Sequence, residues 1–261
     1  MIGLIVNAWI LGLLTAPALA GAATWTLVAL TPDGALFRFP ADEPGPATRT
    51  AVRGVNGALV GIDRRPSNGR LYGVTATGDV YTVDPESGSA TLVSTLTLPF
   101  DGGTRSGVDF NPSTDRLRLV AHDGQNLRVN VELGAAAADT ALSYARNDVH
   151  AGARPAIAAA AYTKNVPGAA ETVLFDLDAA LDLLVRQDPP NDGTLVTVGP
   201  LGVDVPPEAG FEIVSGEGGG TGFAAFAGVL YRIDLGTGAA TAVGPIGGSP
   251  AAIVGLTSRA P

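Results

Sequence analysis

Two aspartates at matching positions of an internal repeat are the first residues that could do chemistry. Asp63 ends the apolar run LVGID, Asp109 ends SGVD, and a proline follows each of them three positions later. Carboxylates that recur at the same end of several strands can form a ring that binds a polar ligand or a cation, since Ca²⁺ takes oxygen ligands. A ring of this kind is the first functional hypothesis.

The same two aspartates also have a structural interpretation, which we favour. Each precedes an arginine by seven positions, Arg70 or Arg116. A carboxylate that caps its turn and pairs with the facing arginine stabilises a hairpin by roughly 1 kcal/mol. The fourth and fifth repeats offer Tyr162 and Ser215 at this position. Because a metal ring needs more carboxylates than two repeats supply, we assign no metal ligand.

Polar side chains gather in three predicted loops and are further candidates for ligand binding. They are Gln125, Asn126 and Arg128 in the first loop, Tyr162 and Asn165 at the second, and Asn191 and Asp192 in the third. Loops on a rigid scaffold often carry recognition, although Asn and Asp are also the residues that tight turns require. Together with the two aspartates, these residues are our candidate ligand-binding positions.

The residue types exclude several kinds of active site. The chain has no cysteine and only two histidines, His122 and His150, which leaves no zinc or copper ligand set of the usual kind. It contains no G-x-S-x-G motif. The glycine-rich run at 216–222 fails the dinucleotide pattern G-x-G-x-x-G, because Thr221 stands at its last position. We therefore assign no catalytic residue.

The elements that position these residues are predicted by the repeat itself. Residues 61–84 match residues 107–130 without a gap, with identical residues at nine of 24 positions. A repeat of 46 residues built from short strands and turns is typical of a β-propeller blade. The length of the chain then predicts an all-β fold of five blades, each with four antiparallel strands.

The sequence also predicts how the ring of blades closes and which strand is outermost in the fourth blade. Residues 251–257 read like the inner strand LVGID, so we expect this carboxyl-terminal segment to complete the amino-terminal blade. Pairing of the two ends closes the ring and leaves no exposed sheet edge. In the fourth blade, we interpret residues 181–187 as the outer strand.

The net charge of the chain and its first 20 residues indicate where the protein is located and which partners it can bind. The formal net charge of −9 opposes binding to nucleic acids and to anionic lipid surfaces. An apolar run ending in Ala-Leu-Ala predicts that residues 1–20 are a secretory signal peptide, with an uncleaved anchor as the alternative. We expect residues 21–261 to form one domain, monomeric and not inserted in a membrane, that is secreted or lies in the periplasm or cell envelope.

Five segments, in order, resemble a family of exported bacterial proteins, domain of unknown function 4394. They are GVDFNPSTDRLRLV at 107–120, GQNLRVN at 124–130, AAYTKN at 160–165, DPPNDGTLVTVGPLGVD at 188–204 and TGAATAVGPIG at 237–247. The resemblance extends from Val28 to Leu256 and implies a propeller-like fold with an export signal. It implies no activity and no catalytic residue.

The function that these observations favour is that of an exported, non-catalytic module without a cofactor, which binds or scaffolds an unidentified protein or a small polar ligand. The first alternative is a cation-dependent hydrolase or lyase, with Ca²⁺ held at the channel mouth by Asp63, Asp109, Asn165 and Asn191. A structural surface protein that self-associates is the second alternative. Fold alone does not decide among them.

Overall fold

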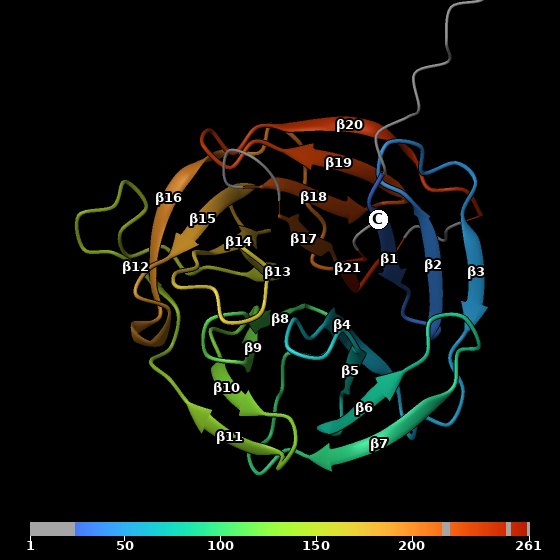
Figure 1. Cartoon of the computed structure of the whole chain (residues 1–261). Coiled ribbons are helices and arrows are strands. Elements are labelled where there is room, and N and C mark those ends of the chain that lie inside the picture. The colour runs from blue at the N-terminus through green and yellow to red at the C-terminus, as the bar shows by residue number, and fades with distance from the viewer. Residues whose placement is uncertain (1–23, 216–219, 249–251, 260–261) are drawn as a thin grey trace, which may run out of the picture.

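The chain folds as a five-bladed β-propeller, which confirms the predicted fold class. The computed structural model describes residues 24–215, 220–248 and 252–259. In this part of the chain, five sheets are arranged radially around a central axis (Figure 1). Each contains four antiparallel strands, and one of them has a fifth, short strand that runs parallel to its neighbour. The predicted signal peptide at 1–20 and residues 216–219 of the glycine-rich run lie outside the described residues. No helix of the described part is both long and apolar enough to cross a membrane.

Each blade extends from an inner strand at the axis to an outer strand at the rim. Blade 1 contains, in this order, β21 (Gly255–Arg259), β1 (Thr26–Leu30), β2 (Ala35–Pro40) and β3 (Thr48–Ala51). Blade 2 contains β4 (Leu59–Arg64), β5 (Leu71–Thr75), β6 (Asp79–Val83) and β7 (Ala90–Thr95). Blade 3 contains β8 (Ser106–Asn111), β9 (Arg116–Ala121), β10 (Asn126–Asn130) and β11 (Ala135–Ala138). Blade 4 contains β13 (Ile157–Tyr162), β14 (Leu174–Asp178), β15 (Leu183–Gln187) and β16 (Thr194–Pro200). In this blade, β12 (Ser143–Tyr144) lies outside β16, and the 3₁₀ helix η1 (Pro190–Asp192) connects β15 to β16. Blade 5 contains β17 (Gly210–Val214), β18 (Thr221–Phe226), β19 (Val229–Ile233) and β20 (Ala240–Pro245).

The hydrophobic core lies between the blades. Five clusters of buried side chains each fill the gap between two neighbouring sheets. Near the axis, both faces of every sheet are therefore covered by a neighbouring blade, whereas the outermost strands β3, β7, β11 and β20 are exposed or half-buried. This explains why the second strands β5 and β14 are buried at every residue.

Glycines let the inner strands approach one another around the axis. Gly61, Gly107, Gly210 and Gly255 each lie on an inner strand, and a Cβ atom at any of them would come within 3.0 Å of the next blade. Only a residue without a side chain fits this close contact. The glycines therefore set the narrow width of the channel.

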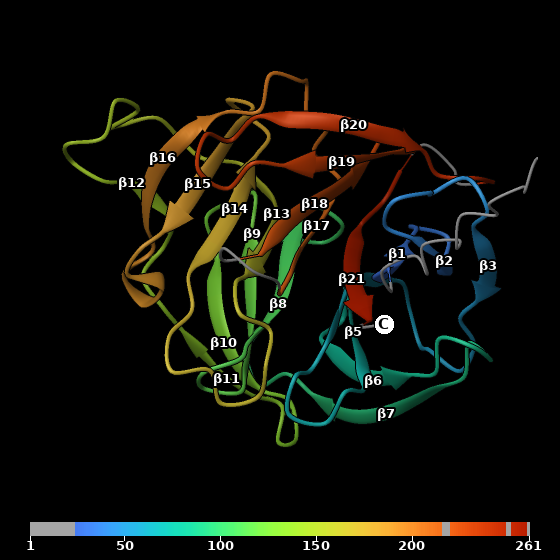
Figure 2. The same cartoon turned by 45° about the horizontal axis from the view of Figure 1, so that its top comes forward.

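The two ends of the described chain meet in blade 1, as predicted. Strand β21 pairs antiparallel with β1, from Thr26 opposite Arg259 to Leu30 opposite Gly255. Figure 2 shows β21 beside β1, between blade 5 and blade 2. The last strand of the sequence thus supplies the inner strand of the first blade.

The prediction for blade 4 was wrong in one respect. Residues 181–187 were expected to form its outer strand, but β15 is the third strand and β16 lies outside it. A long connection at 163–173 separates β13 from β14. This insertion moves the later strands out of the 46-residue register, so counting by the repeat assigns them one place too far out.

Candidate functional site

A ring of polar side chains surrounds the channel two residues beyond the inner-strand glycines. Its members are Asp63 in blade 2, Asp109 in blade 3, Glu212 in blade 5 and Thr257 in blade 1. Blade 4 has Ala161 at this position. All four polar residues are buried, with exposed fractions of at most 3%.

At three of the five blade junctions, the ring connects one blade to the next by side-chain to main-chain hydrogen bonds. Asp63 Oδ2 accepts from the main-chain nitrogen of Phe110 at 2.7 Å, and Asp109 Oδ1 accepts from that of Tyr162 at 3.0 Å. Thr257 Oγ1 accepts from the nitrogen of Arg64 at 3.1 Å and donates to Asp63 Oδ1 at 2.7 Å. The same geometry thus recurs at three blade junctions.

Asn165 bridges the junction where Ala161 leaves the ring incomplete. Its Nδ2 donates to Glu212 Oε1 at 3.1 Å and to the main-chain oxygen of Ile213 at 3.2 Å. Ser258 Oγ also donates to Glu212 Oε1, at 2.8 Å. The loop residue therefore performs in blade 4 the connecting role that an inner-strand side chain performs elsewhere.

Burial and mutual repulsion make the three carboxyl groups of the ring hard to ionise. Oxygen atoms of Asp63, Asp109 and Glu212 all lie within 4.8 Å of one another. Removal from water raises the pKa of Asp63 to about 6 and the pKa of Glu212 to about 8, and the charge of Asp63 adds to the effect on Glu212. Burial, followed by the charges of Asp63 and Glu212, raises the pKa of Asp109 well above its usual range.

The structure corrects the predicted pairing of the two aspartates. Asp63 and Asp109 were expected to pair with Arg70 and Arg116 across their hairpins, but they face Tyr72 and Arg118 and accept hydrogen bonds from the neighbouring blade. Each expected arginine comes two residues before the residue that the aspartate faces. Because of this register, the expected arginine does not lie opposite the aspartate in the hairpin.

The ring position of the fourth and fifth blades was also misplaced. It was assigned to Tyr162 and Ser215, but it belongs to Ala161 and Glu212. The signal for Glu212 was present, because Gly210-Phe-Glu repeats the Gly-x-Asp pattern of 61–63 and 107–109. Three of the five repeats, rather than two, therefore contribute a carboxylate.

Thr257 provides a direct test of the ring. We predict that Thr257→Val lowers the free energy of unfolding by about 2 kcal/mol, because the buried Asp63 and the Arg64 main chain each lose a partner. Thr257→Ser retains the hydroxyl and is expected to cost less. Urea unfolding of both variants checks this, and a valine variant as stable as the parent would contradict it.

A second polar cluster is organised by a buried arginine between blades 3 and 4. Arg118, only 2% exposed, donates from Nη1 to Asn126 Oδ1 at 2.7 Å and to Asp139 Oδ2 at 2.6 Å. Its Nη2 donates to Asn191 Oδ1 at 2.7 Å, and its Nε donates to the hydroxyl of Tyr162 at 3.3 Å. Three residues predicted from the sequence, on three different elements, thus meet at one guanidinium that was not predicted.

This cluster forms one wall of a cavity of about 390 Å³. The cavity is lined by polar and cationic side chains of blade 3, together with Tyr162 and the η1 loop of blade 4. They are Asn111, Thr114, Arg116, Arg118, Arg128, Tyr162, Pro189, Pro190 and Asn191. In the described chain, Arg128 donates only through Nε, to Asp139, which leaves both of its Nη groups available at the cavity. We call this cavity the arginine pocket.

The remaining predicted residues lie outside both clusters. Gln125 ties two loops together, since its Nε2 donates to the main-chain oxygen of Pro99 and its Oε1 accepts from the nitrogen of Asp101. Asp192 is an exposed residue of η1. The candidates therefore divide into the carboxylate ring, the arginine pocket and these two residues, which line neither.

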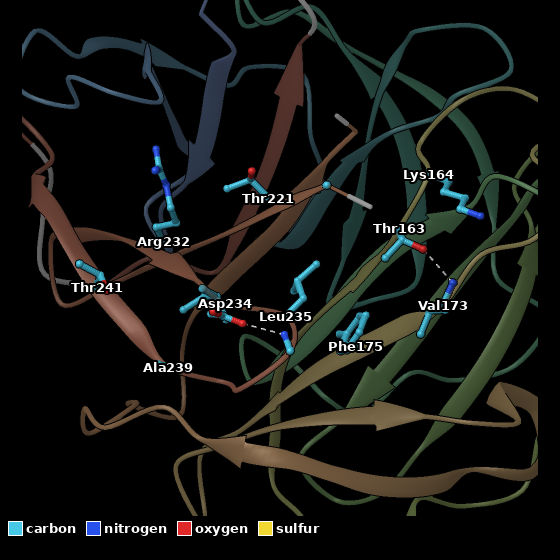
Figure 3. Close-up of a pocket in the computed structure, with 13 residues that line it drawn as sticks. Thr163, Lys164, Val173, Phe175, Thr221, Arg232, Asp234, Leu235, Ala239 and Thr241 are labelled. Atoms are coloured by element: carbon cyan, nitrogen blue, oxygen red, sulfur yellow. Dashed lines mark hydrogen bonds between the residues drawn. The ribbon is translucent and has the colours of Figure 1, made fainter. Parts of the chain in front are cut away.

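A larger cavity of about 750 Å³ lies between blades 4 and 5. Figure 3 shows Phe175 and Leu235 inside it, with Lys164 on one side and Arg232 on the other. Lys164 pairs with Glu171. The cavity contains none of the predicted binding residues, and its wall ends at Gly220, beside residues that the structure does not describe.

The solved structures to which the chain is similar are distant in sequence. A structural-genomics protein of unknown function from Bacteroides thetaiotaomicron is 16% identical over 85% of this chain, with a TM-score of 0.52. A catalytically inactive virginiamycin B lyase from Staphylococcus aureus, solved with quinupristin, is 11% identical over 86% of this chain and 71% of its own, with a TM-score of 0.45. An auxiliary nutrient binding protein from B. thetaiotaomicron is 15% identical over 76% of this chain and 55% of its own, with a TM-score of 0.46. The chain spans 58% of the first of these proteins, and the similarity shows the fold alone.

Comparison of the sequence with protein-family models assigns the chain to a family. None of the curated proteins compared with the chain matches. A family model described as a domain of unknown function (DUF4394) matches residues 35–257, which include the ring and the arginine pocket. The chain therefore belongs to the DUF4394 family.

Proposed function

We propose that this chain is an exported, non-catalytic binding module and that its ligand is a small molecule with a carboxylate or phosphate group, held in the arginine pocket. The observation that supports this is that Arg128, whose Nε donates to Asp139, has both Nη groups free of bonds to the described residues in the lining of a polar cavity. Guanidinium groups bind carboxylates and phosphates through paired, charge-assisted hydrogen bonds. The chain has a net charge of −9, so a cationic pocket that binds an anion differs in sign from the charge of the whole protein.

The pocket has the rigidity that a binding site needs. Arg118 is fixed by Asn126, Asp139 and Asn191, and Asp139 in turn orients Arg128 through its Nε at 2.7 Å. Groups that are held before the ligand arrives lose little entropy on binding. The cavity volume is within the usual range for small-molecule sites, and a ligand the size of a sugar acid fits it.

Binding is favoured over cation-dependent catalysis by the position of the carboxylates. Asp63, Asp109 and Glu212 have exposed fractions of 3%, 0% and 1%. A substrate needs access to catalytic groups, and these face the interior of the ring. The arginine pocket, in contrast, presents cationic and amide groups in an open cavity.

Calorimetric titration with glucuronate, glucose and inorganic phosphate tests the proposal. We expect glucuronate to bind at least about 10-fold more tightly than the neutral glucose, because a hydrogen bond to a charged group contributes about 1.5–3 kcal/mol. Phosphate distinguishes recognition of the charge alone from recognition of a sugar acid.

Matched arginine variants locate the site. Arg128→Gln is expected to weaken glucuronate binding about 10-fold or more, whereas Arg146→Gln, which removes an exposed arginine outside the pocket, leaves it unchanged. Equal binding by the Arg128 variant and the parent, or no discrimination between glucuronate and glucose, would refute the proposal.

A further inference from the structure

The carboxylate ring gathers more negative charge than the described protein compensates. One carboxylate oxygen each of Asp63, Asp109 and Glu212 lies within 4.8 Å of the other two, and all three residues are buried. Asp176 on β14 is also fully buried, and its charge acts on Asp109. Like charges at this spacing cannot all be ionised unless a cation or protons join them.

Several of these oxygens also have no hydrogen-bond partner. Asp63 has both oxygens satisfied by donors. In contrast, Asp109 Oδ2, Glu212 Oε2 and both oxygens of Asp176 are buried and accept no hydrogen bond from the described residues. A buried polar group without a partner is costly, and more so when it is charged. These unused oxygens indicate that a group other than the described protein satisfies them.

The charge of Arg64 acts on Asp63 and Glu212, and that of Arg118 acts on Asp176, but the nearby cationic side chains direct their hydrogen bonds elsewhere. Arg64 directs Nε to the main-chain oxygen of Ser258 and Nη1 to that of Gly69. Arg118 is occupied by Asp139 and two amides. Lys164 pairs with Glu171. Among the described residues, the side chains of these three donate no hydrogen bond to a carboxylate of the ring.

We propose that Asp63, Asp109 and Glu212 bind one hard divalent cation, with Ca²⁺ as the best fit, on the axis of the propeller. The distances suit this ion, because oxygens on opposite sides of Ca²⁺ are about twice its bond length of roughly 2.4 Å apart, and the three ring oxygens lie within 4.8 Å of one another. Asn165 Oδ1 is a buried oxygen with no partner among the residues that the structure describes, and because Asn165 contacts Glu212 it is a further ligand candidate. Water completes the six to eight ligands that Ca²⁺ takes.

The role of such an ion is structural. Its ligands come from blades 2, 3 and 5, and so the cation joins sheets that are far apart in the sequence. This site is separate from the arginine pocket, and either can exist without the other.

Calcium binding by the EDTA-treated, dialysed protein tests the proposal. We expect one Ca²⁺ per chain by calorimetric titration and by elemental analysis after dialysis. We also expect a Tm higher by about 5 °C or more at saturating Ca²⁺, because a ligand that binds only the folded state stabilises it. Failure of Ca²⁺, Mg²⁺ and Mn²⁺ at millimolar concentration to bind or to change the Tm would overturn the proposal.

Two variants and a matched control place the ion at the ring. Glu212→Gln is expected to fold in EDTA like the parent, since the amide keeps the oxygen that accepts from Ser258 and Asn165, but to lose the calcium-dependent rise in Tm. Asp109→Asn provides a second test if the first variant folds poorly. Glu43→Gln removes an exposed carboxylate and should respond like the parent. A normal response of both ring variants would place the ion elsewhere and overturn the proposal.

Discussion

Replacing Arg118 by methionine is expected to lower the free energy of unfolding by about 3–5 kcal/mol. Removing one partner of a buried ion pair leaves the other charge uncompensated, and this accounts for a loss of that size. Asp139, with 5% of its side chain exposed, would retain only the half-exposed Arg128 as a partner. Asn126, Asn191 and Tyr162 would each lose a hydrogen bond as well.

Guanidinium chloride unfolding measures this effect, and Arg128→Met is the matched control. Arg128 contacts the same carboxylate, but 42% of its side chain is exposed, so we expect its loss to cost about 1 kcal/mol or less. If the two variants are equally stable, Arg118 does not organise the cluster. Because the arginine pocket depends on this cluster, Arg118→Met should also lose glucuronate binding.

Gly107→Ala is expected to destabilise the propeller by about 3 kcal/mol or more. A Cβ atom at this position would lie 2.5 Å from the main-chain nitrogen of Ala160 and 2.9 Å from the carbonyl carbon of Ala159. These are main-chain atoms of the next blade, which cannot rotate away as a flexible side chain can. Overpacking of this kind usually costs about 1–3 kcal/mol, and about 3 or more is expected where two main chains are in contact.

Gly45→Ala is the control for this prediction. A Cβ atom at Gly45 meets nothing within 4 Å, so this variant should stay within about 0.5 kcal/mol of the parent. Urea unfolding of both variants provides the comparison. Equal stability would mean that the inner strands can move apart and that the channel is not fixed by close contact.

The fold could be predicted from the sequence because the turn residues between the strands recur at the period of the repeat. The 46-residue period and the likeness of 251–257 to LVGID predict five sheets and their closure, and the structure confirms both. In blade 4, the strand order was predicted wrongly because the connection at 163–173 interrupts the 46-residue period. An insertion in one loop shifts every strand that follows it.

The central residue of the arginine pocket could not be predicted from the pattern of its strand. In RLRLV, leucines alternate with arginines, which normally indicates that Arg118 faces solvent. In a propeller, the second face of the strand is covered by the next blade, and Arg118 is buried there. Its partners Asn126, Asn191 and Tyr162 were predicted as candidates because they stand in or beside polar loops, without any indication that they share one contact.

The pairing of β21 with β1 also determines the order in which the molecule can fold. Blades 2 to 5 are each built from a contiguous stretch of chain, and they can form from local hairpins while the rest is still being made. Blade 1 needs contacts between the two ends of the sequence, and closing so long a loop slows folding. Until residues 255–259 arrive, β1 has no partner on its inner edge, and this nascent, open ring is the form most exposed to aggregation.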